Sequence, residues 1–152
     1  MLHKFTNKQV ANLLKEIAAC YEIKNENAFK IRAYDNASSV IEKLDSDIGN
    51  LWAENSLENV PCIGKSLEEH LSELFKTGKV KHFDEVKKEF PQGMFELLNV
   101  PGIGAKTAFK LAKEFNLDSP KKALSQIKEL AEKGKIRGLS GFGEESENRI
   151  LQ

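Results

Sequence analysis

The stretch LLNVPGIGAKTAFKLAKEF, residues 97–115, decides the fold, because its pattern predicts a helix end, a glycine-punctuated hairpin and a second helix. Pro101 ends the first helix, since proline lacks the amide of a helical hydrogen bond and disfavours helical geometry just before it. Gly102 and Gly104 permit positive φ and leave no Cβ between the backbone and an incoming group. The first amides of the second helix have no partner within that helix. Together with the hairpin amides, they predict a partly positive surface suited to a phosphate oxygen.

The same hairpin pattern occurs at two further places in the chain. Residues 60–75, VPCIGKSLEEHLSELF, share six of sixteen positions with residues 100–115, VPGIGAKTAFKLAKEF. Residues 139–151, LSGFGEESENRIL, repeat the glycine–apolar–glycine pattern before another helical sequence. Ordinary helix–turn–helix corners with glycine caps would not repeat the apolar positions as well. Offsets of 40 and then 39 residues therefore indicate an internal repeat.

The composition predicts an all-α fold made of two small helical subdomains. The chain has 152 residues, of which 40% are hydrophobic and 30% charged, and only four are prolines. We expect residues 1–80 to form a small four-helix domain with the first hairpin, and residues 81–92 to form a connecting helix or linker. Residues 93–152 then form a second subdomain, which holds the second hairpin and ends in the third. A proline and a glycine within residues 91–93 mark the boundary.

Three polar residues of the first subdomain predict helix caps. We expect Asn7 to cap a helix over residues 7–22. Asp45 and Asp47 form a pair that could bind magnesium at the end of a strand, but between helices we expect them to cap.

Backbone amides that point at phosphate oxygens contact the sugar-phosphate chain without reading its bases. With two or three phosphates neutralised at a hairpin, the log–log salt dependence of binding has a slope of about −2 to −3. The 23 basic and 23 acidic residues give a formal net charge of zero, so contact with a nucleic acid must come from local geometry.

Several classes of protein are excluded by the sequence. Cys20 and Cys62 are too few for a disulfide framework, and the histidines and cysteines lack the spacing of a zinc site. There is no signal peptide and no long apolar span. We therefore expect a cytoplasmic protein that makes no membrane contact.

The ordered combination of motifs resembles the amino-terminal part of family X DNA polymerases, whose helix-hairpin-helix motifs bind DNA. The resemblance rests on the hairpins, on ENAFKIRAYDNAS at residues 26–38 and on GFGEE at residues 141–145. It covers essentially all 152 residues. It is greatest for bacterial and archaeal members that carry a later histidinol-phosphatase-like domain, and more distant for the DNA polymerase beta type.

This resemblance implies that the two subdomains bind different parts of the DNA. The first would bind the 5′-phosphate side of a gap, with Lys30 and Tyr34 at positions that line the 5′-phosphate pocket. The second would grip the duplex on the primer side. The implied phosphate-binding residues are Gly64, Lys65, Ser66, Gly102, Gly104, Lys106, Thr107, Gly141 and Gly143. Monovalent cations, K⁺ or Na⁺, would meet the carbonyls of Val60, Ile63, Leu98, Val100 and Ile103.

The first hairpin departs from the family pattern. Members with lyase activity use a lysine to form a Schiff base, and His70 stands at that position without a primary amine. We expect His70 to be a surface residue of its helix. Ser66 replaces a second lysine of the pocket, and Lys65 is badly placed to substitute for the missing amine. Cys62 replaces the first glycine. Glu58 and Asn59 stand where basic residues would strengthen the 5′-phosphate pocket.

The sequence thus predicts a monomer that binds duplex or gapped DNA without sequence preference, as the gripping part of a family X polymerase in repair synthesis. No strand pattern carries the paired carboxylates that hold catalytic magnesium, so we expect no nucleotidyl transfer by this chain alone. Magnesium would enter only with a catalytic palm domain elsewhere. Two alternatives stay open: an abasic-site (5′-deoxyribose phosphate) lyase and a helical protein-interaction module.

Overall fold

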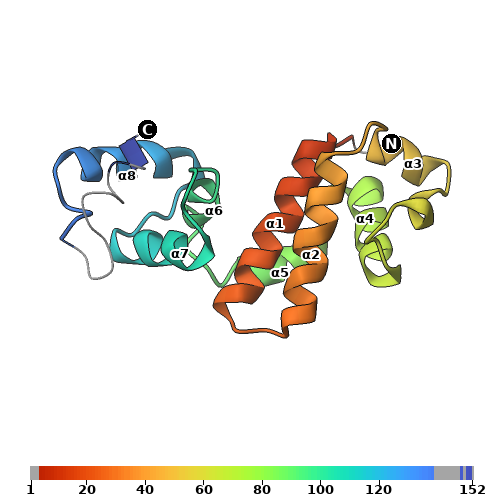
Figure 1. The fold of residues 1–152 in the computed structure, drawn as a ribbon, viewed down its shortest axis with the longest axis horizontal. Coiled ribbons are helices and arrows are strands. Elements are labelled where there is room, and N and C mark those ends of the chain that lie inside the picture. Colours follow the sequence, from red (N-terminus) through yellow and green to blue (C-terminus); the bar gives the residue numbers. More distant parts are fainter. Residues whose placement is uncertain (1–3, 139–147, 149, 152) are drawn as a thin grey trace. The chain divides into compact units, whose positions relative to one another are not determined.

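The computed structural model describes residues 4–138, 148, 150 and 151, and all regular elements among them are helical. The predicted all-α fold is confirmed, with no strand in these ranges. The elements are α1 (Asn7–Ile23), α2 (Ala28–Glu42), α3 (Ile48–Ala53), the short 3-10 helix η1 (Leu57–Asn59), α4 (Lys65–Thr77), α5 (Lys81–Lys87), α6 (Met94–Leu97), α7 (Ala105–Glu114) and α8 (Pro120–Glu132), as Figure 1 shows. Contacts divide the chain into two compact units, Met1–Lys87 and Lys88–Gln152.

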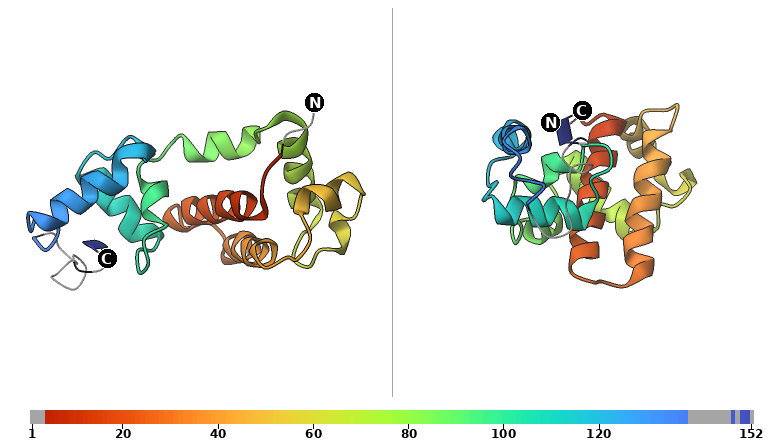
Figure 2. Two further views of the ribbon diagram at one scale, coloured as in Figure 1. Left: turned by 90° about the horizontal axis from the view of Figure 1, so that it is seen from above. Right: turned by 60° about the vertical axis from the view of Figure 1, so that its left-hand side comes forward.

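The first unit is built on α1 and α2, which lie side by side (Figure 2). α5 packs on α1, so the first unit ends within the stretch that the sequence assigned to a connecting helix. Its core is formed by buried apolar side chains from α1, α2, α4 and α5, among them Leu14, Ile17, Ile41, Leu71, Phe75 and Phe83. Burying such side chains contributes about 1.5–3 kcal/mol each, which makes this packing the main source of stability for short helices.

Side-chain caps begin three helices of the first unit. Thr6, and not Asn7, caps α1, in a reciprocal capping box with Gln9. The prediction for Asn7 was wrong because its side chain bonds elsewhere: it donates to the carbonyl of Ser46 and accepts from the amide of Ile48, at 2.8 Å each. Asn27 caps α2. The predicted capping role of Asp47 is confirmed, since its Oδ1 accepts from the amide of Asn50 at 2.9 Å.

The second unit packs α6 against α7 and α8. Its buried residues include Met94, Leu97, Leu111, Ile127 and Ile136. Gly93 is required here, because a Cβ at this position would lie 2.3 Å from the carbonyl oxygen of Leu117, which accepts the Gly93 amide at 2.8 Å. No helix among the described residues is long and apolar enough to cross a membrane.

Candidate nucleic-acid interface

The first two hairpins are built on the same hydrogen-bond frame, 40 residues apart. Three backbone hydrogen bonds define each turn. The first precedes the hairpin, the second spans it, and the third is the first bond of the following helix. In the first hairpin these are Val60 to Leu57 (3.0 Å), Ile63 to Val60 (3.4 Å) and Glu68 to Gly64 (2.9 Å). In the second they are Val100 to Leu97 (3.1 Å), Ile103 to Val100 (3.1 Å) and Ala108 to Gly104 (2.9 Å). The shared sequence pattern therefore produces a shared backbone.

Buried side chains hold each turn from below and leave its tip in solvent. Ile63 and Ile103 are both 9% exposed and anchor their hairpins in the cores of their units. Pro61 and Cys62 at one tip, and Pro101 and Gly102 at the other, are exposed. A rigid base under an exposed tip is the arrangement that a preformed backbone binding site needs.

The second glycine of each hairpin is not explained by the fold itself. Gly64 and Gly104 have ordinary extended backbones, with φ of −87° and −90°, and begin α4 and α7. A Cβ added to either would meet nothing within 4 Å. The space above these two residues is therefore open to an external group that approaches the backbone closely.

The amides beside these glycines have no partner within the described part of the chain. α4 and α7 lack the side-chain cap that α1, α2 and α3 possess. No hydrogen bond of the described residues starts from the amides of residues 64–67 or 104–107. Gly64, Lys65, Ser66, Gly104 and Lys106 are exposed, and Thr107 is half-buried. Donors of this kind carry the positive end of the helix dipole, which favours an anion.

The two hairpins differ in the charge that surrounds them. Glu68 lies in the first turn of α4, where it opposes an anion at the amides. The first turn of α7 has no acidic residue and carries Lys106. Lys113 lies later on α7, with its Nζ 5.6 Å above the ring centre of Phe109. The surroundings of the second hairpin are therefore more favourable to an anion than those of the first.

Carbonyl oxygens at the hairpins offer ligands to a hard cation. No hydrogen bond among the described residues reaches the carbonyls of Ile63 or Ile103. The carbonyls of Val60 and Val100 each accept one bond and retain a second lone pair. Oxygen atoms of this type suit K⁺ or Na⁺. The site implied at Leu98 lies at the start of the second hairpin.

Lys30 and Tyr34 lie in an aromatic cluster of the first unit that the sequence did not reveal. The Lys30 Nζ lies 4.3 Å above the ring centre of Tyr21, and the Tyr34 ring meets Tyr21 edge-on at 5.4 Å. Burial raises the pKa of both tyrosines, so both hydroxyls stay neutral at physiological pH. Tyr34 is buried at 9% exposure, whereas Lys30 is exposed. The lysine is therefore more accessible from solvent than the tyrosine.

His70 of α4 is half-buried in the same cluster, so it keeps part of the surface exposure that the sequence predicted while one side of its ring is packed. Its ring stacks on His82 at 5.4 Å between centres and packs on Phe83 at 5.0 Å. Burial, followed by the charge of His82, lowers the pKa of His70. The Nε2 atom of His82 is hydrogen-bonded to the Tyr21 hydroxyl at 3.0 Å.

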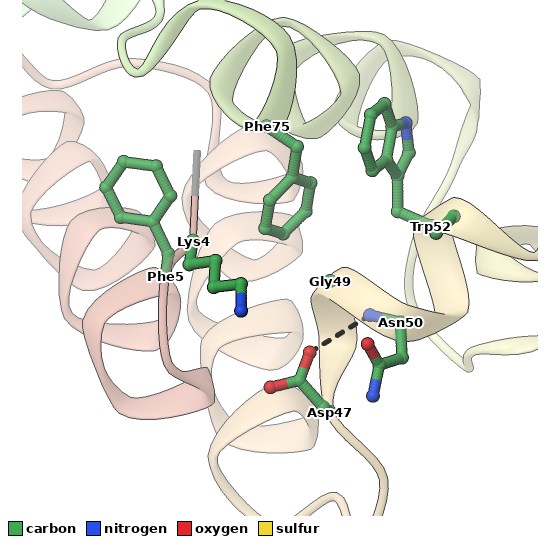
Figure 3. Close-up of a pocket in the computed structure, with 8 residues that line it drawn as sticks. Lys4, Phe5, Asp47, Gly49, Asn50, Trp52 and Phe75 are labelled. Carbon is green, nitrogen blue, oxygen red and sulfur yellow. Dashed lines mark hydrogen bonds between the residues drawn. The ribbon is translucent and has the colours of Figure 1, made fainter. Parts of the chain in front are cut away.

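A separate pocket of about 360 Å³ lies between the N-terminal segment, α3 and the end of α4 (Figure 3). Phe5, Trp52 and Phe75 form its aromatic lining, with Trp52 stacked on Phe75 at 5.3 Å. Asp47 reaches the pocket but already caps α3. Across the described residues, no group of three side chains is arranged to hold a metal ion.

The third hairpin, with Gly141 and Gly143, lies outside the described residues. The geometry of the candidate interface therefore comes from the first two hairpins.

Comparisons with known proteins agree with the repeated hairpin geometry. Residues 5–80 match the family described as Helix-hairpin-helix domain, and residues 94–152 match the SAM-like Helix-hairpin-helix tandem. The chain is 33% identical over 151 residues to the DNA polymerase/3'-5' exonuclease PolX of Bacillus subtilis (strain 168), covering 99% of this chain and 25% of that protein. It is 29% identical over 108 residues to DNA polymerase lambda of Arabidopsis thaliana, covering 69% of this chain and 19% of that protein. The chain thus spans a quarter or less of the length of these relatives, and the predicted resemblance is confirmed.

Proposed function

The chain belongs to the helix-hairpin-helix domain family, and from this premise we propose that it binds DNA through the backbone amides of its hairpins, without preference for base sequence. The similarity to DNA polymerases supports a role as the part of a family X polymerase that holds duplex or gapped DNA during repair synthesis. Catalysis of nucleotidyl transfer is not part of this proposal, because the paired carboxylates it requires are not found in the sequence pattern.

A single observation carries the proposal: the exposed amides at the starts of α4 and α7 have no partner in the described chain and lie beside glycines with open space above them. A phosphate oxygen can accept from such amides, and bonds to a charged acceptor are roughly twice as strong as neutral ones. Because the donors belong to the backbone, they fix the position of the strand and carry no sequence information.

The second hairpin is the principal contact in this proposal. Its first turn carries Lys106 and no acidic residue, whereas Glu68 lies in the first turn after the first hairpin. The carbonyls of Val60, Ile63, Leu98, Val100 and Ile103 would hold K⁺ or Na⁺, which adds a positive charge between the hairpin and a phosphate. Lys30 and Tyr34 would lie near the 5′-phosphate of a gapped strand. The third hairpin would contribute Gly141 and Gly143.

Fluorescence anisotropy with labelled gapped and intact duplexes in KCl tests the proposal. We expect dissociation constants on the order of 10⁻⁴–10⁻⁶ M, with a log–log salt slope of about −2 to −3. Gly104→Val should weaken binding, because the valine side chain fills the open space through which a phosphate would approach the amides. It should leave the fold intact, since a Cβ at this position meets no other atom within 4 Å. Ser119→Val is the matched control, since Ser119 also begins a helix without a side-chain cap but follows no hairpin.

Equal affinities of the two valine variants for DNA would show that the second hairpin does not contact the duplex. If neither duplex bound the unmodified chain below millimolar concentration at low salt, the proposed function itself would be lost.

A further inference from the structure

We propose that the aromatic pocket between the N-terminal segment, α3 and the end of α4 binds a nucleobase that carries an exocyclic amino group, with adenine as the best fit. The base can belong to a free nucleotide or to an unpaired residue of a strand, two sources that share this chemistry. The inference goes beyond the proposed function, because no residue of the pocket lies in the hairpin turns at residues 60–64 and 100–104.

Three aromatic side chains from separate parts of the first unit line the pocket (Figure 3). Phe5 precedes α1, Trp52 lies on α3, and Phe75 lies near the end of α4. Trp52 stacks on Phe75 with 5.3 Å between the ring centres, and Phe5 meets Phe75 edge-on at 6.3 Å. Phe75 is buried, whereas Phe5 and Trp52 are half-buried and keep part of their rings accessible. Aromatic surface of this kind favours a flat partner, and every base has a face that can stack on it.

The floor of the pocket is open because Gly49 has no side chain. A Cβ at this position of α3 would lie 3.4 Å from Cε1 of Phe75 and 3.0 Å from Oδ1 of Asp47. The volume of about 360 Å³ is near the lower end of the range for small-molecule sites, which runs from about 300 to 1,000 Å³. The pocket therefore suits a single ring system better than a long ligand.

The charges at the pocket disfavour a simple ion as its ligand. Lys4 and Asp47 carry opposite charges, and both side chains are exposed. No ion pair among the described residues joins them. A cation attracted by the rings and by Asp47 is repelled by Lys4, and an anion attracted by Lys4 is repelled by Asp47. This combination favours a neutral ring with hydrogen-bond donors and acceptors, and Lys4 can then meet a phosphate attached to that ring.

Asp47 and Asn50 supply the polar edge that selects the base. Oδ1 of Asp47 caps α3 by accepting from the Asn50 amide at 2.9 Å, and its second oxygen accepts no hydrogen bond from the described residues. The Asn50 side chain likewise makes no hydrogen bond within this part of the chain. A carboxylate accepts from an exocyclic amino group, and an asparagine amide pairs with the amino group and ring nitrogen of adenine. Thymine has no amino group and should bind weakest.

Trp52 provides a direct readout, because it is the only tryptophan of the chain and lines the pocket. Its indole Nε1 donates to Oγ of Ser72 at 3.1 Å and gives a single signal in an NMR spectrum of the full chain. The chain is titrated with deoxyadenosine monophosphate (dAMP) and deoxythymidine monophosphate (dTMP). We expect dAMP to shift the indole signal with a dissociation constant on the order of 1 mM. We expect dTMP to bind at least about fivefold more weakly.

Asp47→Asn changes the polar edge but retains the cap, because asparagine caps helices as well as aspartate does. It replaces the available acceptor oxygen with an amino donor, so most of the preference for dAMP over dTMP should be lost. Asp45→Asn is the matched control, since it removes the same charge two residues away at a position that does not line the pocket. This control should keep the full preference.

A tetranucleotide of deoxyadenosine and an intact duplex distinguish the two sources of the base. If dAMP and the tetranucleotide shift the indole signal at similar concentrations of base, the pocket is a nucleotide site. If only the tetranucleotide shifts it, the pocket binds an unpaired base of a strand. The intact duplex should leave the signal unchanged, because its bases are paired, and an equal shift with the duplex would overturn entry of a base.

The remaining outcomes separate the pocket from the hairpins. No indole shift with either adenine ligand overturns the proposal. Equal affinities for dAMP and dTMP also overturn it, as does a preference that Asp47→Asn leaves unchanged. Duplex binding by the same protein, measured by anisotropy, tests the hairpins independently, so loss of the pocket leaves the proposed function standing. If the duplex does not bind, the dAMP titration still decides whether the pocket holds a base.

Discussion

Cys62 in the first hairpin adopts the left-handed backbone conformation that Gly102 adopts in the second, with φ of 70° and 86°. A residue with a Cβ is destabilised in this conformation by about 1–2 kcal/mol relative to glycine. The hydrogen-bond frame of the turn is the same in both hairpins, so the surrounding unit holds Cys62 in a strained backbone.

Replacing Cys62 with glycine should therefore stabilise the chain. We expect Cys62→Gly to raise the free energy of unfolding by about 0.5–1 kcal/mol, because the strain is larger than the added chain entropy of glycine. Urea denaturation followed by circular dichroism measures the change. Cys62→Ala is the control, since alanine keeps the Cβ. Equal stabilisation by alanine and glycine would show that the left-handed backbone is not the cause.

The two thiols should differ sharply in reactivity. Burial raises the pKa of the Cys20 thiol to about 12, so it holds almost no thiolate at pH 8, whereas Cys62 is exposed. In the folded chain, a thiol-specific disulfide reagent should label only Cys62, and in urea it should label both cysteines. Cys62→Ala should abolish the fast reaction, and Cys20→Ala should leave it intact. Two fast thiols in the folded wild-type chain would contradict the buried position of Cys20.

The sequence predicts the hairpins well because their structure is local. The pattern V-P-x-I-G places a turn, a buried anchor and a helix start within five residues, and each of these features is present at residues 60–64 and 100–104. The helical pattern and the capping role of Asp47 are likewise determined by near neighbours.

The aromatic cluster could not be predicted in this way, because its contacts join distant parts of the chain. Tyr21 and His82 are 61 residues apart, and neither residue stands out in a local pattern. The same reason explains the error at Asn7, which had the residue type of a helix cap but bonds across 39 residues to Ser46. Long-range polar contacts of this kind depend on how helices pack, which periodicity alone does not specify.

The stability of the chain should depend on the protonation of His70. Its pKa is lowered in the folded state, so below about 6.5 the unfolded chain binds more protons than the folded one. The contribution of neutral His70 is thus complete above that pH and is lost as the pH falls toward the folded value. Urea unfolding at pH 5.5 and 7.5 should show a larger acid loss for the wild type than for His70→Gln. Equal losses of unfolding free energy in the two proteins would show that His70 does not cause the acid destabilisation, since the carboxylates titrate alike in both.

Lyase activity should be absent from the wild-type chain. A Schiff base needs a primary amine, and the His70 imidazole stacked on His82 cannot supply one. Lys65 lies exposed at the start of α4, beside the hairpin amides and not in the aromatic cluster. Borohydride treatment with incised abasic DNA should therefore trap no adduct, whereas His70→Lys should trap one if the position faces the sugar. An adduct with the wild type that disappears in Lys30→Gln or Lys65→Gln would reinstate the lyase.

The two hairpins should contribute unequally to DNA binding, and a lysine in each first turn can measure this. Lys106 acts without an acidic neighbour in its turn, whereas Glu68 lies in the first turn that Lys65 begins. We expect Lys106→Gln to weaken binding to all sequences alike and to reduce the salt slope by about 1, with a smaller effect of Lys65→Gln. Lys121→Gln, on the exposed first turn of α8, is the control for a general loss of positive charge. If all three variants lost affinity equally, net charge rather than hairpin geometry would govern the interaction, because only Lys65 and Lys106 lie in the first turn of a helix that follows a hairpin.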